Sequence, residues 1–298
     1  MQALNLRPNG IYIDGTLGRG GHSEQIVRRL SDSGRLICID RDRQALEEGA
    51  ERLAPWKDRI TFLHGNFGDL AELLEAEHLD GADGMLFDLG VSSPQLDDPD
   101  RGFSYRYDAP LDMRMCQDDA LTAGIIVNQW PREEIRRILY QYGEERHASA
   151  IASAIERARA VQPIETTLQL VDIIRSAMPA AALREKQHPA KRSFQGIRIA
   201  VNDELTAISR MMQAAIPRLK TGGRLAVISF HSLEDRIVKS ELAAAAKGCT
   251  CPPSFPVCVC GKTPQVKLIS RKPILPSKEE LDVNPRARSA KLRVAEKL

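Results

Sequence analysis

The stretch that decides the fold lies near the N-terminus, where residues 11–22 read Ile-Tyr-Ile-Asp-Gly-Thr-Leu-Gly-Arg-Gly-Gly-His. The apolar run 11–14 ends in an acid, which is typical of a buried strand. The glycines that follow let backbone N–H groups approach a ligand closely because they carry no Cβ. Their order, Gly-x-x-Gly-x-Gly-Gly, differs from the Gly-x-Gly-x-x-Gly of dinucleotide-binding enzymes. An acid followed by such glycines is typical of folds that bind S-adenosylmethionine, and a plain tight turn is the alternative.

Strands and helices alternate through the first 90 residues. Apolar runs predict strands at 11–14, 35–40, 60–63 and 84–89, with helical spacing between them. This alternation predicts an α/β fold with a doubly wound, Rossmann-like parallel sheet, whose ligand lies at the carboxyl ends of the strands. Asp14, Asp40 and Asp88 fall at such ends. Asp40 is placed to accept hydrogen bonds from both ribose hydroxyls of an adenosine cofactor.

The alternation stops after Asp88. Helical stretches dominate residues 109–190, and prolines separate them, so we expect a helical insertion there. The main domain would then comprise residues 1–108 and 191–298. Its second part is predicted to contain one long helix and three strands, at 195–219, 223–230, 266–270 and 290–295.

Composition and charge narrow the class of protein. The chain has 298 residues, of which 43% are hydrophobic and 28% charged, and its net charge is +2, as in an ordinary globular protein. No apolar run approaches the roughly 20 residues that span a bilayer, and no leader follows Met1. We therefore expect a cytoplasmic protein with no membrane partner. Basic residues concentrate in 184–198 and 262–298, which would suit a polyanion or simply a solvated surface.

A short polar motif follows the fourth strand, where residues 88–95 read Asp-Leu-Gly-Val-Ser-Ser-Pro-Gln. Methyltransferases that act on exocyclic amines carry a polar-Pro motif at this point in the fold. The amine of cytosine is a weak nucleophile, and acceptors that hold its N–H hydrogens can direct its lone pair at the sulfonium methyl. Ser92 or Ser93, with a backbone carbonyl held by Pro94, would supply those acceptors. A Ser/Pro turn without chemistry is the alternative.

Aromatic residues and arginines alternate shortly afterwards, in Arg-Gly-Phe-Ser-Tyr-Arg-Tyr at 101–107. Such side chains suit a base removed from its stack. The aromatic rings could equally be core anchors.

Five motifs resemble one family, the ribosomal RNA small subunit methyltransferase H family (RsmH, formerly MraW). They are the segments 14–22, 88–95, 101–104 (Arg-Gly-Phe-Ser), 194–204 (Phe-Gln-Gly-Ile-Arg-Ile-Ala-Val-Asn-Asp-Glu) and 229–236 (Ser-Phe-His-Ser-Leu-Glu-Asp-Arg). The resemblance spans essentially the whole chain. It implies methylation of N4 of a cytidine in the decoding region of 16S rRNA, within the small ribosomal subunit, with S-adenosylmethionine as donor. It also implies that the helical insertion 109–190 helps to recognise substrate.

The resemblance also assigns residues to the site. Cofactor contacts fall on Gly20, Gly21, His22, Asp40, Phe67, Asp88 and Gln95. With Ser92, Ser93 and Pro94 of the motif described above, Asn202 and His231 complete the catalytic set, and Glu204, Phe230 and Ser232 look like supporting residues. A structural role is the alternative for His231. His22 could instead be only a helix-start residue. Members of the family usually carry some further residues before the position of Gln2, so contacts made by that arm are in doubt here.

Six cysteines are present, four of them in the pattern Cys249-x-Cys251-x6-Cys258-x-Cys260. Four thiolates could bind zinc, but structural zinc sites favour two or more residues between paired cysteines. We therefore expect no metal. The remaining alternatives concern function: a ribosome-assembly factor without turnover, or a methyltransferase with another amine acceptor. The oligomeric state is left open, a homodimer being one option.

Overall fold

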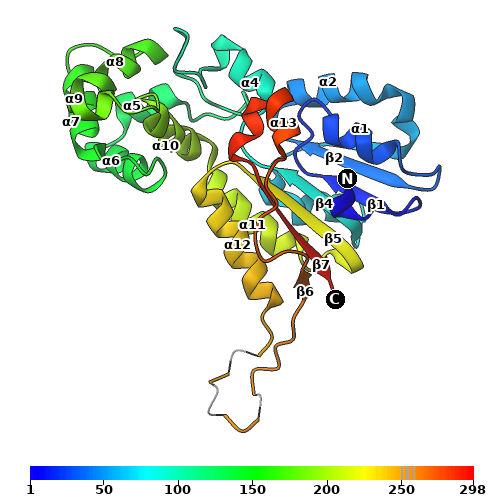
Figure 1. The fold of residues 1–298 in the computed structure, drawn as a ribbon. Coiled ribbons are helices and arrows are strands. Elements are labelled where there is room, and N and C mark those ends of the chain that lie inside the picture. Colours follow the sequence, from blue (N-terminus) through cyan, green and yellow to red (C-terminus); the bar gives the residue numbers. More distant parts are fainter. Residues whose placement is uncertain (250, 253–254, 258) are drawn as a thin grey trace. The chain divides into compact units, whose positions relative to one another are not determined.

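The computed structural model describes residues 1–249, 251–252, 255–257 and 259–298, and it divides the chain into two compact units. One comprises Met1–Gly90 and Leu205–Leu298, and the other comprises Val91–Glu204 (Figure 1). Cys258 of the cysteine pattern lies outside the described residues. Within the described ranges, none of the helices has the length and apolar character needed to cross a membrane.

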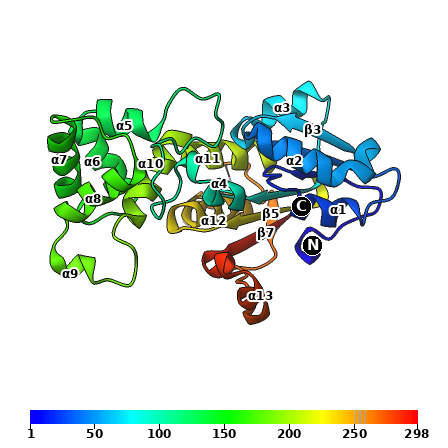
Figure 2. The same cartoon turned by 90° about the horizontal axis from the view of Figure 1, so that it is seen from above.

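The first unit is built on a seven-stranded sheet with the strand order β3-β2-β1-β4-β5-β7-β6. The strands are β1 (Ile11–Asp14), β2 (Arg35–Asp40), β3 (Ile60–His64), β4 (Ala82–Asp88), β5 (Leu219–Ser229), β6 (Val266–Leu268) and β7 (Lys291–Lys297). Strands β1 to β5 pair in parallel, as predicted. The sheet is mixed, because β7, one of the two closing strands predicted without a direction, runs antiparallel between β5 and β6. Strands β5 and β7 lie side by side in Figures 1 and 2.

Alternate residues of the central strands fill two cores, one on each face of the sheet. On one face, Ile13, Met85 and Val227 pack with helices α3 (Leu70–Ala76), α11 (Glu204–Ala215) and α12 (Ser232–Ala246). On the other face, Tyr12 and Leu86 pack with α1 (Gly21–Val27) and α2 (Arg43–Leu53). Both faces are covered, so the strands read as continuous apolar runs rather than as alternating ones.

The second unit is helical and has a core of its own. It contains α4 (Ser93–Asp97), α5 (Ala123–Gln129), α6 (Arg132–Gln141), α7 (Ala148–Arg159), α8 (Thr167–Ala177), α9 (Ala180–Leu183) and α10 (Lys191–Asn202). Apolar residues of α5, α6, α7, α8 and α10 form one cluster, in which Ile126, Ile138, Ile151, Leu170 and Ile197 are fully buried. This unit covers more of the chain than the predicted insertion 109–190, because it also includes residues 91–108 and helix α10.

The prediction of a single long helix over 195–219 is wrong. The region forms two helices, α10 and α11, which are separated at Asp203, and the φ of Asp203 is 48°, in the left-handed region. A left-handed residue ends an α-helix because its carbonyl no longer lies along the helix axis. The border between the two compact units falls one residue later, after Glu204.

Candidate active site

The glycine turn between β1 and α1 is shaped by one close approach and two left-handed residues. A Cβ on Gly15 would lie 2.1 Å from the Phe87 ring of the neighbouring strand, so only glycine fits. Gly18 and Gly20 have φ angles of 50° and 72°, a region that side chains disfavour. A Cβ on Gly18 or Gly21 would meet no atom within 4 Å. The turn therefore exposes its backbone on the side where these two glycines lie.

Asp14, the acid that ends β1, lies beneath this turn and is fully buried. Its carboxylate accepts hydrogen bonds from the Ser23 hydroxyl at 2.7 Å and from the Thr16 N–H at 3.2 Å. Burial raises the pKa of Asp14 to about 6, although the Ser23 hydrogen bond acts in the opposite direction. Asp14 thus holds the start of α1 against the strand and does not face the surface.

Asp40, at the end of β2, binds the same turn from the other side. Its Oδ2 accepts the Gly18 N–H at 2.8 Å, and its Oδ1 accepts the Asp42 N–H at 2.9 Å. Burial raises the pKa of the Asp40 carboxyl, and these two hydrogen bonds oppose that rise. Each carboxylate oxygen can accept more than one hydrogen bond, so Asp40 retains capacity for hydroxyl donors.

Asp88 ends β4 beside His22, the second residue of α1. Their side chains approach to 3.5 Å between His22 Nε2 and Asp88 Oδ2. The hydrogen bond to Asp88 raises the pKa of His22, while burial opposes the rise. In the part of the chain that the structure describes, the buried Oδ1 of Asp88 has no hydrogen-bond partner. A buried carboxylate oxygen without a donor is costly, and a ligand donor would satisfy it.

Phe67 begins the 3₁₀ turn Phe67–Asp69 after β3. Its ring packs edge-on against Phe87, with centroids 6.1 Å apart and planes at 69°. Part of the ring therefore belongs to the core of the first unit, and part remains accessible.

In the helical unit, residues 92–95 form a capping box at the start of α4. The Ser92 hydroxyl accepts the Gln95 N–H, and Gln95 Oε1 accepts the Ser92 N–H at 3.0 Å. The Pro94 carbonyl accepts the Asp98 N–H at 2.8 Å. Gln95 is only 5% exposed, whereas Ser93 is exposed. The structure thus engages Ser92, Pro94 and Gln95 in the helix start and leaves Ser93 facing solvent.

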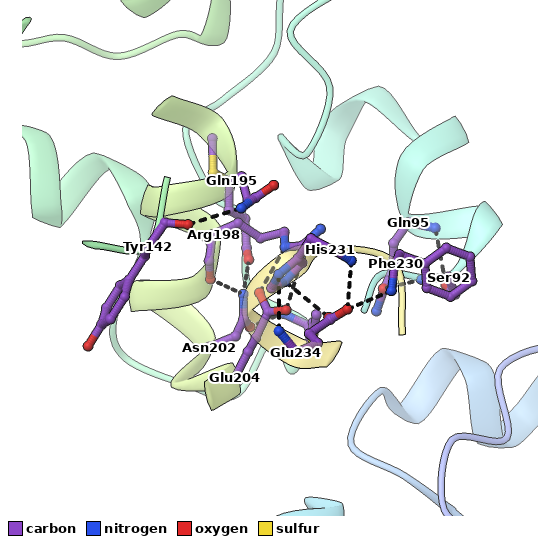
Figure 3. Close-up of polar contacts among 12 residues, drawn as sticks. Ser92, Gln95, Tyr142, Gln195, Arg198, Asn202, Glu204, Phe230, His231 and Glu234 are labelled. Carbon is purple, nitrogen blue, oxygen red and sulfur yellow. Dashed lines mark hydrogen bonds and ion pairs between the residues drawn. The ribbon is translucent and has the colours of Figure 1, made fainter. Parts of the chain in front are cut away.

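Asn202, at the end of α10, is buried and hydrogen-bonds to three backbone groups (Figure 3). Its Oδ1 accepts the Met115 N–H at 2.8 Å, and its Nδ2 donates to the Met113 carbonyl at 2.8 Å and the Arg198 carbonyl at 2.9 Å. The guanidinium of Arg101 donates to the Met115 carbonyl at 2.9 Å. Asn202 therefore positions the loop around residues 113–115.

His231, in the first unit, caps α12 together with Glu234 (Figure 3). Its Nδ1 accepts the Glu234 N–H at 3.4 Å, and its Nε2 lies 3.1 Å from Glu234 Oε1. The other Glu234 oxygen, Oε2, accepts the Phe230 N–H at 2.7 Å. The pair orders the turn between β5 and α12.

The Arg/aromatic segment 101–107 divides into buried and exposed members. Arg101 and Phe103 are 4% and 6% exposed, and Phe103 is a core anchor, which was the alternative for the aromatic rings. Tyr105 stacks on His188 with the ring centroids 4.4 Å apart. Arg106 and Tyr107 are exposed, and Ser104 and Tyr105 are half-buried.

One family model, described as the MraW methylase family, matches residues 1–298. The chain belongs to this family. It is 56% identical to the ribosomal RNA small subunit methyltransferase H of Symbiobacterium thermophilum, over all of this chain and 94% of that one. The enzyme of the same name from Brevibacillus brevis is also 56% identical, over 95% of its length. The structure of an rRNA methylase from Streptococcus thermophilus covers 100% of this chain and 90% of that one, with 13% identity and a TM-score of 0.40. The membership in the MraW methylase family rests on the family model and the two relatives, not on this structural likeness.

Two ion-pairing residues of this MraW methylase, Arg198 and Glu234, were not predicted as site residues from the sequence. Arg198 Nε and Nη2 each lie 2.8 Å from a Glu204 oxygen, although α10 ends between the two residues. The two residues are six positions apart in the sequence, whereas ion pairs on one helix face are three or four positions apart, so helical periodicity does not predict this pair. Glu234 did have a signal, because His231-x-x-Glu234 has the form of a capping box with histidine in the place of serine.

Proposed function

We propose that this protein transfers a methyl group from S-adenosylmethionine to N4 of a cytidine in 16S rRNA of the small ribosomal subunit. The observation that carries the proposal is the hydrogen bond from the Gly18 N–H to Asp40, which joins the glycine turn after β1 to the acid that ends β2. Ligands of open α/β sheets bind at such carboxyl ends. Membership in the MraW methylase family supports methyl transfer as the reaction.

The residues of the first unit fit this cofactor. The backbone at Gly21 is open, and the neighbouring carboxylates of Asp40 and Asp88 are acceptors. Asp40 would accept hydrogen bonds from the ribose hydroxyls, while Asp88 Oδ1 would accept one from a donor of the methionine part. The accessible part of Phe67 would contact the adenine. The bound cofactor would supply an electrophilic methyl group on a sulfonium centre.

The acceptor side of the reaction needs few groups. The N4 lone pair would accept the methyl group that the cofactor supplies, and one amine proton would then be released to solvent. Before that step, an acceptor must hold the amine hydrogens so that the lone pair is free to react. Ser93 is the best candidate in the motif, since its side chain is exposed while Ser92 and Gln95 are engaged with each other.

The helical unit would recognise the RNA. Arg106 and Tyr107 are exposed on it, as are Arg184, Lys186 and Lys191 of the basic segment. Exposed cations bind the phosphate backbone, and an exposed ring stacks on an unpaired base. The relatives named above carry the substrate in their names, ribosomal RNA of the small subunit, which supports the same substrate here.

The proposal is tested by incubating the protein with methyl-labelled S-adenosylmethionine and small subunits from a strain that lacks this enzyme. Label in a cytidine of 16S rRNA, released as N4-methylcytidine after digestion, is the expected result. Tight cofactor binding without transfer would favour an assembly factor instead. Label in another nucleoside, or transfer only to DNA or a small amine, would overturn the assigned acceptor. The control is Asp58→Ala, an exposed acid in the turn between α2 and β3.

A further inference from the structure

Among the described residues of the segment between α12 and β6, three cysteines gather outside the candidate active site. Their Sγ atoms, from Cys249, Cys251 and Cys260, all lie within 4.8 Å of one another. We propose that these three side chains bind a zinc ion as thiolates. The site is separate from the methyl-transfer chemistry, so the proposal does not depend on the proposed function.

The distance between two of these sulfurs favours a metal over a disulfide. The Sγ atoms of Cys249 and Cys260 are 3.7 Å apart. A disulfide requires about 2.05 Å. Zinc–sulfur bonds of about 2.3 Å in tetrahedral geometry place neighbouring sulfurs about 3.8 Å apart, close to the distance found here. Tetrahedral thiolate sites select zinc among the common divalent ions.

The backbone around the cysteines is arranged as it is around bound thiolates. The Cys251 N–H points at Cys249 Sγ, and the Val259 N–H points at Cys251 Sγ, each at 3.4 Å. Gly261, directly after Cys260, has a φ of 62° and lets the chain turn away from the sulfurs. Hydrogen bonds to ligand atoms orient them and stabilise their charged form. The short Cys-x-Cys spacing by itself predicted neither the closeness of the three sulfurs nor these hydrogen bonds.

The described residues of the segment hold its shape with few contacts, one of them the hydrogen bond from the Phe255 N–H to the Pro252 carbonyl at 3.0 Å. The base of the segment is closed by the hydrogen bond from the Gln265 N–H to the Ala245 carbonyl, at 2.8 Å. Beyond it, the apolar side chains Phe255, Val257 and Val259 are 49%, 70% and 74% exposed, so they form no core. Small segments without a core are commonly ordered by a structural metal, whose binding free energy then stabilises the fold.

The test uses the full chain, produced in zinc-supplemented medium and purified without chelator. Elemental analysis is expected to find about one zinc per chain. Exchange with Co²⁺ is expected to give the intense thiolate-to-cobalt charge-transfer absorption that oxygen and nitrogen ligands do not give. Cys249→Ser, Cys251→Ser and Cys260→Ser should each lose the zinc and this absorption.

Two control variants separate the site from general damage. Val257→Ser changes an exposed residue of the same segment, and Cys116→Ser removes a buried thiol of the helical unit. Both should retain the zinc, and circular dichroism should show every variant folded. Wild-type protein without zinc, zinc retained in all three cysteine variants, or a Cys249–Cys260 disulfide found by mass spectrometry would overturn the proposal.

Discussion

The Gly18 N–H donates to Asp40 Oδ2 across 2.8 Å, so the acid that ends β2 holds the glycine turn that follows β1. A second bond, from the Asp42 N–H to Oδ1, fixes the carboxylate itself. The group that would bind the ribose is thus also the group that shapes the turn beside it. Loss of Asp40 should therefore affect the cofactor site twice.

Asp40→Ala is expected to weaken S-adenosylmethionine binding by about 10- to 100-fold, the scale of one lost hydrogen bond to a charged group. Asp40→Asn should lose less, because its amide oxygen can still accept one of the two backbone hydrogen bonds. Isothermal titration calorimetry measures both, with Asp58→Ala as the control. Unchanged affinity in Asp40→Ala would remove Asp40 from the binding site.

The sheet was predictable because its signals are local. A buried strand ending in an acid, such as 35–40, is a continuous apolar run that needs no tertiary information. The antiparallel β7 was not predictable in direction, since a strand of seven residues reads the same in either orientation. The break at Asp203 was missed because the left-handed residue there is an aspartate rather than a glycine.

The sequence motifs proposed residues for the site but said less about the contacts that those residues make. Motifs singled out Asp40, Asp88 and Asn202, because residue type and position are written in the sequence. They gave no signal that Asn202 is buried with its amide bonded to Met113 and Met115, distant in the chain. Gln95 likewise proved to be a partner of the Ser92 backbone, which follows from a capping spacing that could have been recognised.

Ser93→Ala is expected to leave cofactor affinity unchanged and to slow methyl transfer by about 10- to 100-fold, as for one hydrogen bond lost in the transition state. Ser92→Ala differs because it removes the cap of α4 and should cost about 1 kcal/mol of stability. Single-turnover transfer rates and calorimetry distinguish the two. Equal loss of cofactor affinity in both variants would contradict the role given to Ser93.

Asn202→Ala leaves the buried Met115 N–H without its acceptor and should cost about 1–3 kcal/mol of unfolding free energy. Asn128 offers a matched control, because it binds the Ile164 N–H and the Gly124 and Ile164 carbonyls in the same manner, at 2.8–2.9 Å. Urea midpoints should fall similarly in Asn202→Ala and Asn128→Ala. The methyl-transfer rate should fall more in Asn202→Ala than in Asn128→Ala. Equal transfer rates in the two variants would mean that Asn202 contributes to stability alone.

Asp14 predicts how stability depends on pH. Its folded pKa of about 6 lies above the ordinary 3.8, so the folded protein holds a proton that the unfolded chain has released between those values. Stability due to this group is therefore complete below pH 4 and is lost as the pH rises through about 6, a change of about 3 kcal/mol. Asp14→Asn keeps the shape but cannot ionise. The urea midpoint of Asp14→Asn, relative to that of wild type at the same pH, should rise between pH 4 and pH 7. If the difference between the two midpoints stays constant over this range, Asp14 does not titrate in it.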